Sequence, residues 1–163
     1  MTFDPVAVLA VLRAHRVDCI VIGGFAALLH GSALPTLDVD ITPSTDAANL
    51  ARLSDALTAL GARIRTATEP EGLAFSHDAT SLAAATVWNL QTVHGDLDLS
   101  FRPSGTAGFD DLAEGAEDVA LSDVLTIRVA SLADVIRSKD AANRDKDRRA
   151  LPLLRRLLDE KEG

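Results

Sequence analysis

The stretch "GGFAALLHGSALPTLDVDI", residues 23–41, decides which fold this chain can form. Its glycine pair closes a β-branched run, strong helix formers follow, and apolar and acidic residues then alternate over residues 37–41. In a strand, residues two apart point to the same side, about 6.5 to 7 Å apart, so Asp38 and Asp40 project together while their neighbours face the core. We therefore expect a strand, a helix and a second strand that carries two adjacent carboxylates.

Two adjacent carboxylates repel each other, so they require water, a basic partner or a divalent cation. A second Asp-x-Asp pattern occurs at Asp96 and Asp98. Three aspartates from two neighbouring strands would form a two-metal site for phosphoryl transfer, because Mg²⁺ prefers carboxylate oxygens and leaves positions for substrate phosphates. The alternative is that each pair is only the solvated face of an amphipathic strand.

Upstream of the first acidic pair, Gly23 and Gly24 lie between a strand and a helix. Free backbone N–H groups and the positive end of a helix can hold an anionic phosphate at such a turn. A phosphate-holding turn followed closely by two carboxylates forms a coherent site, and this combination favours the functional interpretation of the aspartates.

Length and composition narrow the class of protein. The 163 residues, 47 % of them hydrophobic, suffice for a single domain, residues 1–163, with its own core. Cys19 is the only cysteine, so we expect a buried small hydrophobe rather than a disulfide or a cysteine metal cluster. The N-terminus lacks a signal-peptide pattern and no apolar stretch is long enough to span a bilayer, which predicts a soluble, cytoplasmic protein without a membrane partner.

Charge is distributed unevenly along the chain. The net charge of -8 argues against a surface that binds nucleic acid throughout. Half of the 16 Lys and Arg residues nevertheless lie within residues 137–156, where they could hold a phosphate or form the solvated face of a helix.

Periodicity predicts an α/β arrangement. Helices are expected at residues 5–16, 25–31, 43–61, 131–143 and 145–160, with Ser44 or Thr45 and then Ser131 as N-caps. Strands are expected at residues 17–24, 37–41, 63–65 and 73–75, in a hairpin over 86–101 that turns at His94 and Gly95, and as a strand or hairpin over 117–130. Pro152 should kink the last helix or mark its start.

Three segments carry a resemblance to a known group of proteins: "GGFAALLHGSALPTLDVDI", "GDLDLSF" at residues 95–101 and "SLADVIRSKDAANRDKD" at residues 131–147. They resemble the nucleotidyltransferase superfamily, which includes DNA polymerase beta, the CCA-adding enzymes and kanamycin nucleotidyltransferase. They are most similar to small bacterial AbiEii-type nucleotidyltransferase proteins. The resemblance implies a small, mixed, twisted sheet flanked by helices, with a core over residues 17–130 and a C-terminal helical pair over residues 131–160.

The resemblance also implies roles for the acidic residues. Asp38 and Asp40 match the principal metal ligands, and Asp98 matches the third carboxylate, which deprotonates the attacking hydroxyl or binds a second metal ion. Asp96 shares its strand face and could take that role, but the family pattern favours Asp98.

For the nucleotide phosphates, the resemblance implies a second set of residues. These are Gly23, Gly24, Thr36, Lys139, Arg144 and Lys146, with Asp147 as the orienting partner of a cation. Lys139 would neutralise the triphosphate or the leaving pyrophosphate. The chain departs from many relatives at Leu34, where they have an arginine, and at Asp140, where they often have a basic residue or glutamate.

The activity implied is transfer of a nucleoside monophosphate from a nucleoside triphosphate, with two Mg²⁺ ions, to a hydroxyl acceptor. The acceptor would be a tRNA end, a protein or a small molecule such as an antibiotic, and a role as the toxin of a toxin-antitoxin pair would imply a cognate antitoxin. The main alternative is a catalytically inert nucleotide-binding or partner-binding module, to which Leu34 gives some weight. A metal-dependent phosphohydrolase or nuclease is a third hypothesis.

Three further residues are expected to be structural. His30 would cap or pack a turn, His94 would lie on the hairpin surface, and Trp88 would belong to the core, since no basic residues are interleaved with it as in a base-stacking platform.

Overall fold

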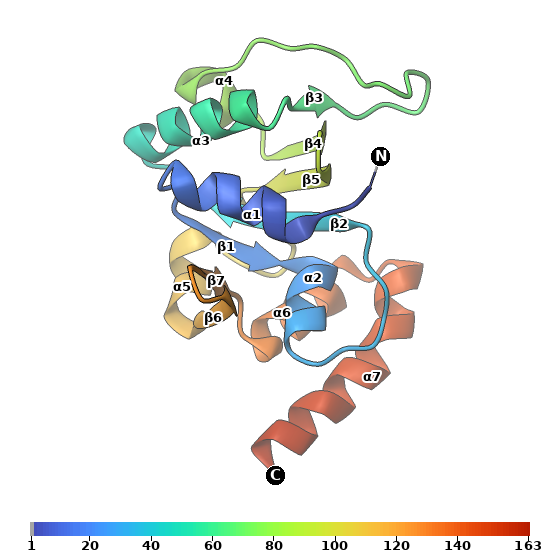
Figure 1. The fold of residues 1–163 in the computed structure, drawn as a ribbon. Coiled ribbons are helices and arrows are strands. Elements are labelled where there is room, and N and C mark those ends of the chain that lie inside the picture. The colour runs from blue at the N-terminus through green and yellow to red at the C-terminus, as the bar shows by residue number, and fades with distance from the viewer. Residues whose placement is uncertain (1) are drawn as a thin grey trace.

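The computed structural model describes residues 2–163, and within them a seven-stranded mixed sheet is flanked by seven helices (Figure 1). The helices are α1 (Pro5–Ala14), α2 (Gly23–Leu29), α3 (Ala47–Ala59), α4 (Ala79–Ala83), α5 (Phe109–Gly115), α6 (Leu132–Ala142) and α7 (Asp145–Glu162). The strands are β1 (Cys19–Ile22), β2 (Asp38–Pro43), β3 (Arg63–Ile64), β4 (Val87–Thr92), β5 (Gly95–Ser100), β6 (Glu117–Ser122) and β7 (Leu125–Val129). The predicted α/β fold is confirmed.

The sheet has the strand order β3-β4-β5-β2-β1-β7-β6. At its centre, β2 pairs antiparallel with β1 and parallel with β5, and the register sets Asp38 opposite Asp96 and Asp40 opposite Asp98. Residues directly opposite each other on paired strands share a face of the sheet. The alternation predicted for both acidic strands is therefore observed, with Val39 and Leu97 fully buried on the other face.

The predicted hairpin is confirmed, with its turn one residue earlier than expected. Val93 and His94 form the turn, and Gly95 begins β5 with a φ of 118°. A Cβ at Gly95 would lie 2.7 Å from Cδ1 of Phe3, so this glycine serves the close approach of the N-terminal segment as well as the backbone conformation.

Helices α2, α6 and α7 build one wall of the molecule. α2 begins at Gly23, directly after β1, and packs on β2 and α6, while α6 packs on α7 (Figure 1). Ser131 caps α6, as predicted, by accepting a hydrogen bond from the N–H of Asp134 at 3.1 Å. α7 carries a buried stripe that includes Leu151 and Leu154, and its C-terminal end projects away from the sheet (Figure 1).

Several local expectations were wrong. α3 takes Asp46 rather than Ser44 or Thr45 as its N-cap position, and Asp46 makes no side-chain cap. α7 begins at Asp145, as expected, and of the two alternatives for Pro152 the helix start is wrong, because Pro152 lies inside the helix. In place of a strand over residues 73–75, Leu73 alone forms a bridge with Ile64.

Two short helices, α4 and α5, were not predicted. α4 depends on a capping box between Asp78 and Ser81, and α5 follows Gly108, which has a φ of 99°. Five and seven residues long, they are too short for the periodicity that identifies longer helices.

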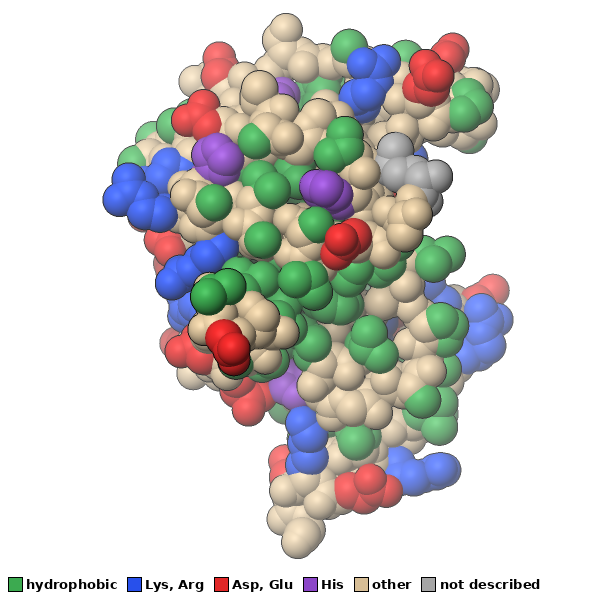
Figure 2. Space-filling model, viewed as in Figure 1, with side chains coloured by type: hydrophobic (Ala, Val, Ile, Leu, Met, Phe, Trp, Pro, Cys, Tyr) green, Lys and Arg blue, Asp and Glu red, His purple; other side chains and the backbone are tan. Residues whose placement is uncertain are grey.

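Cys19 is partly buried against the core, and burial raises the pKa of its thiol to about 12, which fits the predicted role of a small hydrophobe. Figure 2 shows acidic and basic side chains interspersed over one face of the molecule. Among the described helices, none has the length and apolar character needed to cross a membrane.

Candidate active site

The acidic site is a cluster of three carboxylates on β2 and β5. Asp38, Asp40 and Asp98 each offer one oxygen, and these oxygens lie within 4.8 Å of one another. All three residues are half-buried, so the cluster opens to solvent on one side. A set of carboxylate oxygens at this spacing suits a hard divalent cation such as Mg²⁺.

The raised pKa values of two carboxyl groups in the cluster also favour a bound cation. Burial, together with the negative charges of Asp38 and Asp98, raises the pKa of Asp40 to about 8. Burial also raises the pKa of Asp98, although the Arg65 guanidinium opposes the shift. A bound divalent cation would favour the ionised carboxylates, so it would relieve a repulsion that is built into the fold.

Gly23 and Gly24 lie directly against the acidic strand. Gly23 has a φ of 70°, and a Cβ there would clash with Oδ2 of Asp40. A Cβ at Gly24 would lie 3.1 Å from Oγ1 of Thr36. Both glycines thus allow the first turn of α2 to approach β2 closely, and only glycine meets the two requirements at position 23.

The side chain of Thr36 contacts Asp38, the first residue of β2. Its Oγ1 donates to the backbone carbonyl of Asp38 at 3.2 Å and lies 3.4 Å from Oδ1 of the same residue. The residue proposed for phosphate binding therefore also contacts a carboxylate of the cluster.

A second group of charges surrounds Asp147 at the start of α7. Asp147 is completely buried, and Nε of Arg144 donates to it at 2.7 Å, while Nζ of Lys139 on α6 lies 3.6 Å away. Burial opposes ionisation of Asp147, but the hydrogen bonds from Arg144 and the charges of Arg144 and Lys139 outweigh it and lower the pKa. Asp147 thus joins two cations from different helices.

A cleft of about 1020 Å³ brings the two groups together. It is lined by nine of the predicted site residues: Gly23, Gly24, Thr36, Asp38, Asp40, Asp98, Lys139, Arg144 and Lys146. Asp147 lies behind Lys139 and Arg144 rather than in the lining. Asp96 is also absent from the lining and from the 4.8 Å cluster, and it lies 3.4 Å from Nη1 of Arg65.

Three residues in or beside the site were not predicted from the sequence. Nη2 of Arg65 lies 2.7 Å from Oδ1 of Asp98, Asn89 pairs with Asp98 across β4 and β5, and Arg149 lines the cleft from α7. Arg149 belongs to the basic segment noted in the sequence, and the predicted hairpin could have placed Asn89. No local signal identifies Arg65, because its partner is 33 residues away.

The residues expected to be structural are so. His30 is buried, its Nε2 lies 2.8 Å from the carbonyl of Ala130, and it is not among the residues that line the cleft. Trp88 donates to the carbonyl of Leu82 at 3.1 Å and packs against the core. His94 lies in the β4–β5 turn.

Comparison with known proteins agrees with this architecture. No protein-family model and no curated protein matches the sequence. The solved structure of the lincosamide antibiotic adenylyltransferase LnuA with bound lincomycin is similar, with a TM-score of 0.63 and 15 % identity over 96 % of this chain and 99 % of that chain. A Thermotoga maritima protein assigned as a nucleotidyltransferase is similar with a TM-score of 0.51 and 15 % identity, over 96 % and 91 % of the two chains.

At this level of identity the likeness shows the fold. The chain has a nucleotidyltransferase fold, as its three sequence segments predicted. The closer resemblance to AbiEii-type proteins stays a prediction.

Proposed function

We propose that the protein is a nucleotidyltransferase that moves a nucleoside monophosphate from a nucleoside triphosphate to a hydroxyl acceptor. The observation that carries the proposal is the cluster of Asp38, Asp40 and Asp98, with oxygens within 4.8 Å of one another in a cleft that also holds Lys139 and Lys146. Carboxylates for cations and nearby basic side chains for phosphates are the two requirements of phosphoryl transfer.

Asp38, Asp40 and Asp98 would hold two Mg²⁺ ions, which stabilise the attacking and leaving oxygens when bound. Lys139, Arg144 and Lys146 would neutralise the triphosphate, and Asp147 would keep Lys139 and Arg144 in place. The acceptor oxygen forms a bond to the α-phosphorus, the bond to pyrophosphate breaks, and Asp98 accepts the proton of the hydroxyl. Pyrophosphate leaves along the basic wall of the cleft.

The wall next to Asp98 supports a small-molecule acceptor. Val87, Asn89 and Ser100 share the face of Asp98 and line the cleft, and they carry no charge. The basic residues in the lining all come from the segment 139–149 on the other side. A tRNA end would bring further phosphates that need basic partners, whereas a neutral hydroxyl compound would not. The fold neighbour with bound lincomycin is consistent with this choice.

A toxin role is the second candidate for the biological setting, and it rests on the resemblance to AbiEii-type proteins. In that setting the acceptor would be a cellular tRNA or protein, and a cognate antitoxin would cover the cleft. A small antitoxin-like reading frame beside the gene would support it.

The test begins with calorimetric titration of ATP, CTP, GTP and UTP in the presence of MgCl₂. The nucleotide that binds is then supplied with a labelled α-phosphate to three acceptor pools: total tRNA, cell protein, and a set of hydroxyl-bearing antibiotics that includes lincomycin. We expect labelled adduct in the antibiotic pool, and we expect Asp38→Asn with Asp40→Asn to abolish it.

Each other outcome supports a different function. Nucleotide binding without any adduct, unchanged by the double substitution, would support the inert module. Release of phosphate or nucleotide with no adduct would identify a phosphohydrolase or nuclease. Adduct on tRNA or protein alone would support the toxin role.

A further inference from the structure

We propose that Arg65 is a positioning residue for Asp98, and that it restrains cation binding at the carboxylate cluster while it supports transfer. This inference rests on the function proposed above, because Asp98 is given its role there. Arg65 lies outside the cleft lining and acts through Asp98 rather than on a substrate.

The backbone and side chain of Arg65 are anchored on β4. Its N–H donates to the carbonyl of Asn89 at 2.9 Å, and Nη1 donates to the carbonyl of Leu90 at 3.0 Å. From this anchor the guanidinium reaches past β4 to β5, where Nη2 donates to Oδ1 of Asp98 at 2.7 Å and Nη1 lies 3.4 Å from Oδ2 of Asp96. A planar guanidinium held by a carbonyl and two carboxylates has little freedom to rotate.

The side from which Arg65 approaches Asp98 determines how the Asp98 carboxylate is oriented. β5 lies between β4 and β2 in the sheet, so Arg65 approaches Asp98 from the side opposite to Asp38 and Asp40. If the Arg65 guanidinium did not hold Asp98 from its own side, the repulsion from Asp38 and Asp40 would turn the Asp98 carboxylate away from them. Arg65 uses Oδ1 of Asp98 and leaves its other oxygen for a cation or for a proton from the acceptor.

Removal of the Arg65 charge therefore has opposite effects on two measurable properties. The cluster becomes more negative by one unit, so a divalent cation should bind more tightly, by roughly fivefold for a partly solvated site. The Asp98 carboxylate loses its fixed orientation, so the rate of transfer should fall by about 10-fold to 100-fold, the usual cost of losing a group that orients a ligand. A residue with a merely structural role would weaken both.

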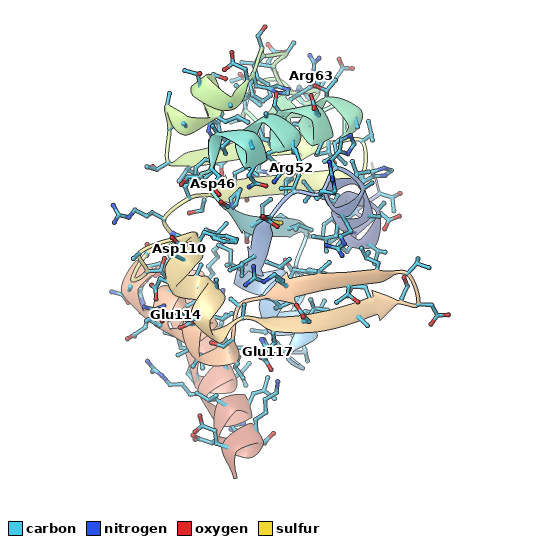
Figure 3. The ribbon with its side chains drawn as sticks, turned by 90° about the vertical axis from the view of Figure 1, so that its left-hand side faces the viewer. Asp46, Arg52, Arg63, Asp110, Glu114 and Glu117 are labelled. Atoms are coloured by element: carbon cyan, nitrogen blue, oxygen red, sulfur yellow. The ribbon has the colours of Figure 1, made fainter. Side chains whose placement is uncertain are left out.

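Arg63, in β3 two residues before Arg65, provides a matched control. Its Nε and Nη2 donate to the carbonyls of Glu71 and Gly72, at 2.8 Å and 3.2 Å, and no carboxylate pairs with it among the described residues. Figure 3 shows Arg63 at the β3 end of the molecule, beside α3. Loss of this arginine removes an equal charge and a similar number of backbone hydrogen bonds without touching Asp98.

The experiment compares Arg65→Gln, Arg65→Lys and Arg63→Gln with the unsubstituted protein. Calorimetric titration with MnCl₂ in the absence of nucleotide gives cation affinity, and thermal unfolding gives stability. Transfer to the acceptor found above gives kcat and KM. We expect Arg65→Gln to bind Mn²⁺ about fivefold more tightly and to lose kcat with KM for the nucleotide within threefold.

The two remaining variants sharpen the result. Arg65→Lys should restore Mn²⁺ affinity to within twofold and recover part of kcat, because it keeps the charge without the planar fork. Arg63→Gln should leave both properties unchanged. If Arg65→Gln binds Mn²⁺ no more tightly than Arg63→Gln, the inference is overturned. Failure of the unsubstituted protein to bind Mn²⁺ would instead refute the proposed function, so the two failures are distinguishable.

Discussion

Asp40, which is half-buried, and Asp147, which is completely buried, belong to the same site, yet their pKa values move in opposite directions. Burial and the two neighbouring carboxylates together raise the pKa of Asp40 to about 8. Burial also opposes ionisation of Asp147, but Arg144 and Lys139 outweigh it, so that pKa falls. On the basic side of the cleft the buried carboxylate is neutralised by its own cationic partners, whereas on the acidic side Arg65 pairs with Asp98 alone, and Asp38 and Asp40 have no ion-pair partner among the described residues.

The difference shows where the site requires a ligand. A buried charge with hydrogen-bonded partners is compensated within the fold, and a buried cluster of like charges is not. This contrast supports the proposal that a cation completes the acidic side, and that Lys139 and Arg144, held by Asp147, are placed to meet an anion on the basic side.

The largest expected effect comes from the acidic side of this comparison. Asp40→Asn should lower transfer by about a thousandfold or more, because it removes a cation ligand next to the reacting phosphate. The same substitution should leave the cation-free protein as stable as before or more stable, because Asn cannot ionise and so adds no charge to a repulsive cluster as pH rises. Transfer assays and urea unfolding in EDTA check the two parts, and a destabilised Asp40→Asn protein would contradict the account of the cluster.

On the basic side, Asp147→Ala should destabilise the protein. It leaves Lys139 and Arg144 without their shared partner, and since Arg144 is partly exposed we expect a cost of about 1 to 3 kcal/mol in the free energy of unfolding. KM for the nucleotide should rise as the two cations lose their anchor. Urea unfolding and steady-state kinetics measure both effects.

Asp145→Asn is the matched control for Asp147, since it lies two residues earlier in the same helix with a largely exposed side chain. Equal stability loss in the two variants would show that burial of Asp147 is not what matters.

The pH dependence of stability distinguishes the two aspartates further. In EDTA, folded Asp40 keeps its proton up to about pH 8, whereas an unfolded aspartate releases it near pH 4. The folded state then binds more protons than the unfolded state between these values, so stability should fall as pH rises through this window. Asp147 contributes in the opposite sense, and its stabilisation should be lost as pH falls below about 4.

Thermal unfolding between pH 5 and pH 9 tests the contribution of Asp40. MgCl₂ should flatten the decline because the cation takes the place of the proton, and Asp40→Asn should flatten it without MgCl₂. A decline that persists in Asp40→Asn would assign it to other groups.

The smallest expected effect concerns Arg149, which lines the basic wall without an ion-pair partner among the described residues. Arg149→Gln should raise KM for the nucleotide by roughly twofold to fivefold, because a partly solvated charge contributes little to phosphate binding. Arg148→Gln is the control, since Arg148 pairs with Asp145 and does not line the cleft. Equal changes in KM would remove Arg149 from the site.

Much of this site was predictable because its signals are local. Alternation within residues 37–41 placed Asp38 and Asp40 on one face, and the same pattern in β5 placed Asp96 and Asp98 together, while the choice of Asp98 came from the family resemblance. Arg65 could not be placed, because β3 has only two residues and the ion pair with Asp98 depends on how β4 and β5 pair beside it in the sheet. The helices α4 and α5 were missed because they depend on caps and a single turn rather than on periodicity.

The parallel pairing of β2 with β5 has a consequence for how such a protein can change. Neighbouring strands in the sheet are separated by a long excursion of the chain, residues 44–94, which supplies α3, β3, α4 and β4. This excursion carries Val87, Asn89 and Arg65, while the basic wall comes from the far end of the sequence. An insertion or replacement within residues 44–94 would therefore alter the side chains beside Asp98 and leave the basic wall intact, so one side of the cleft can change in sequence without the other.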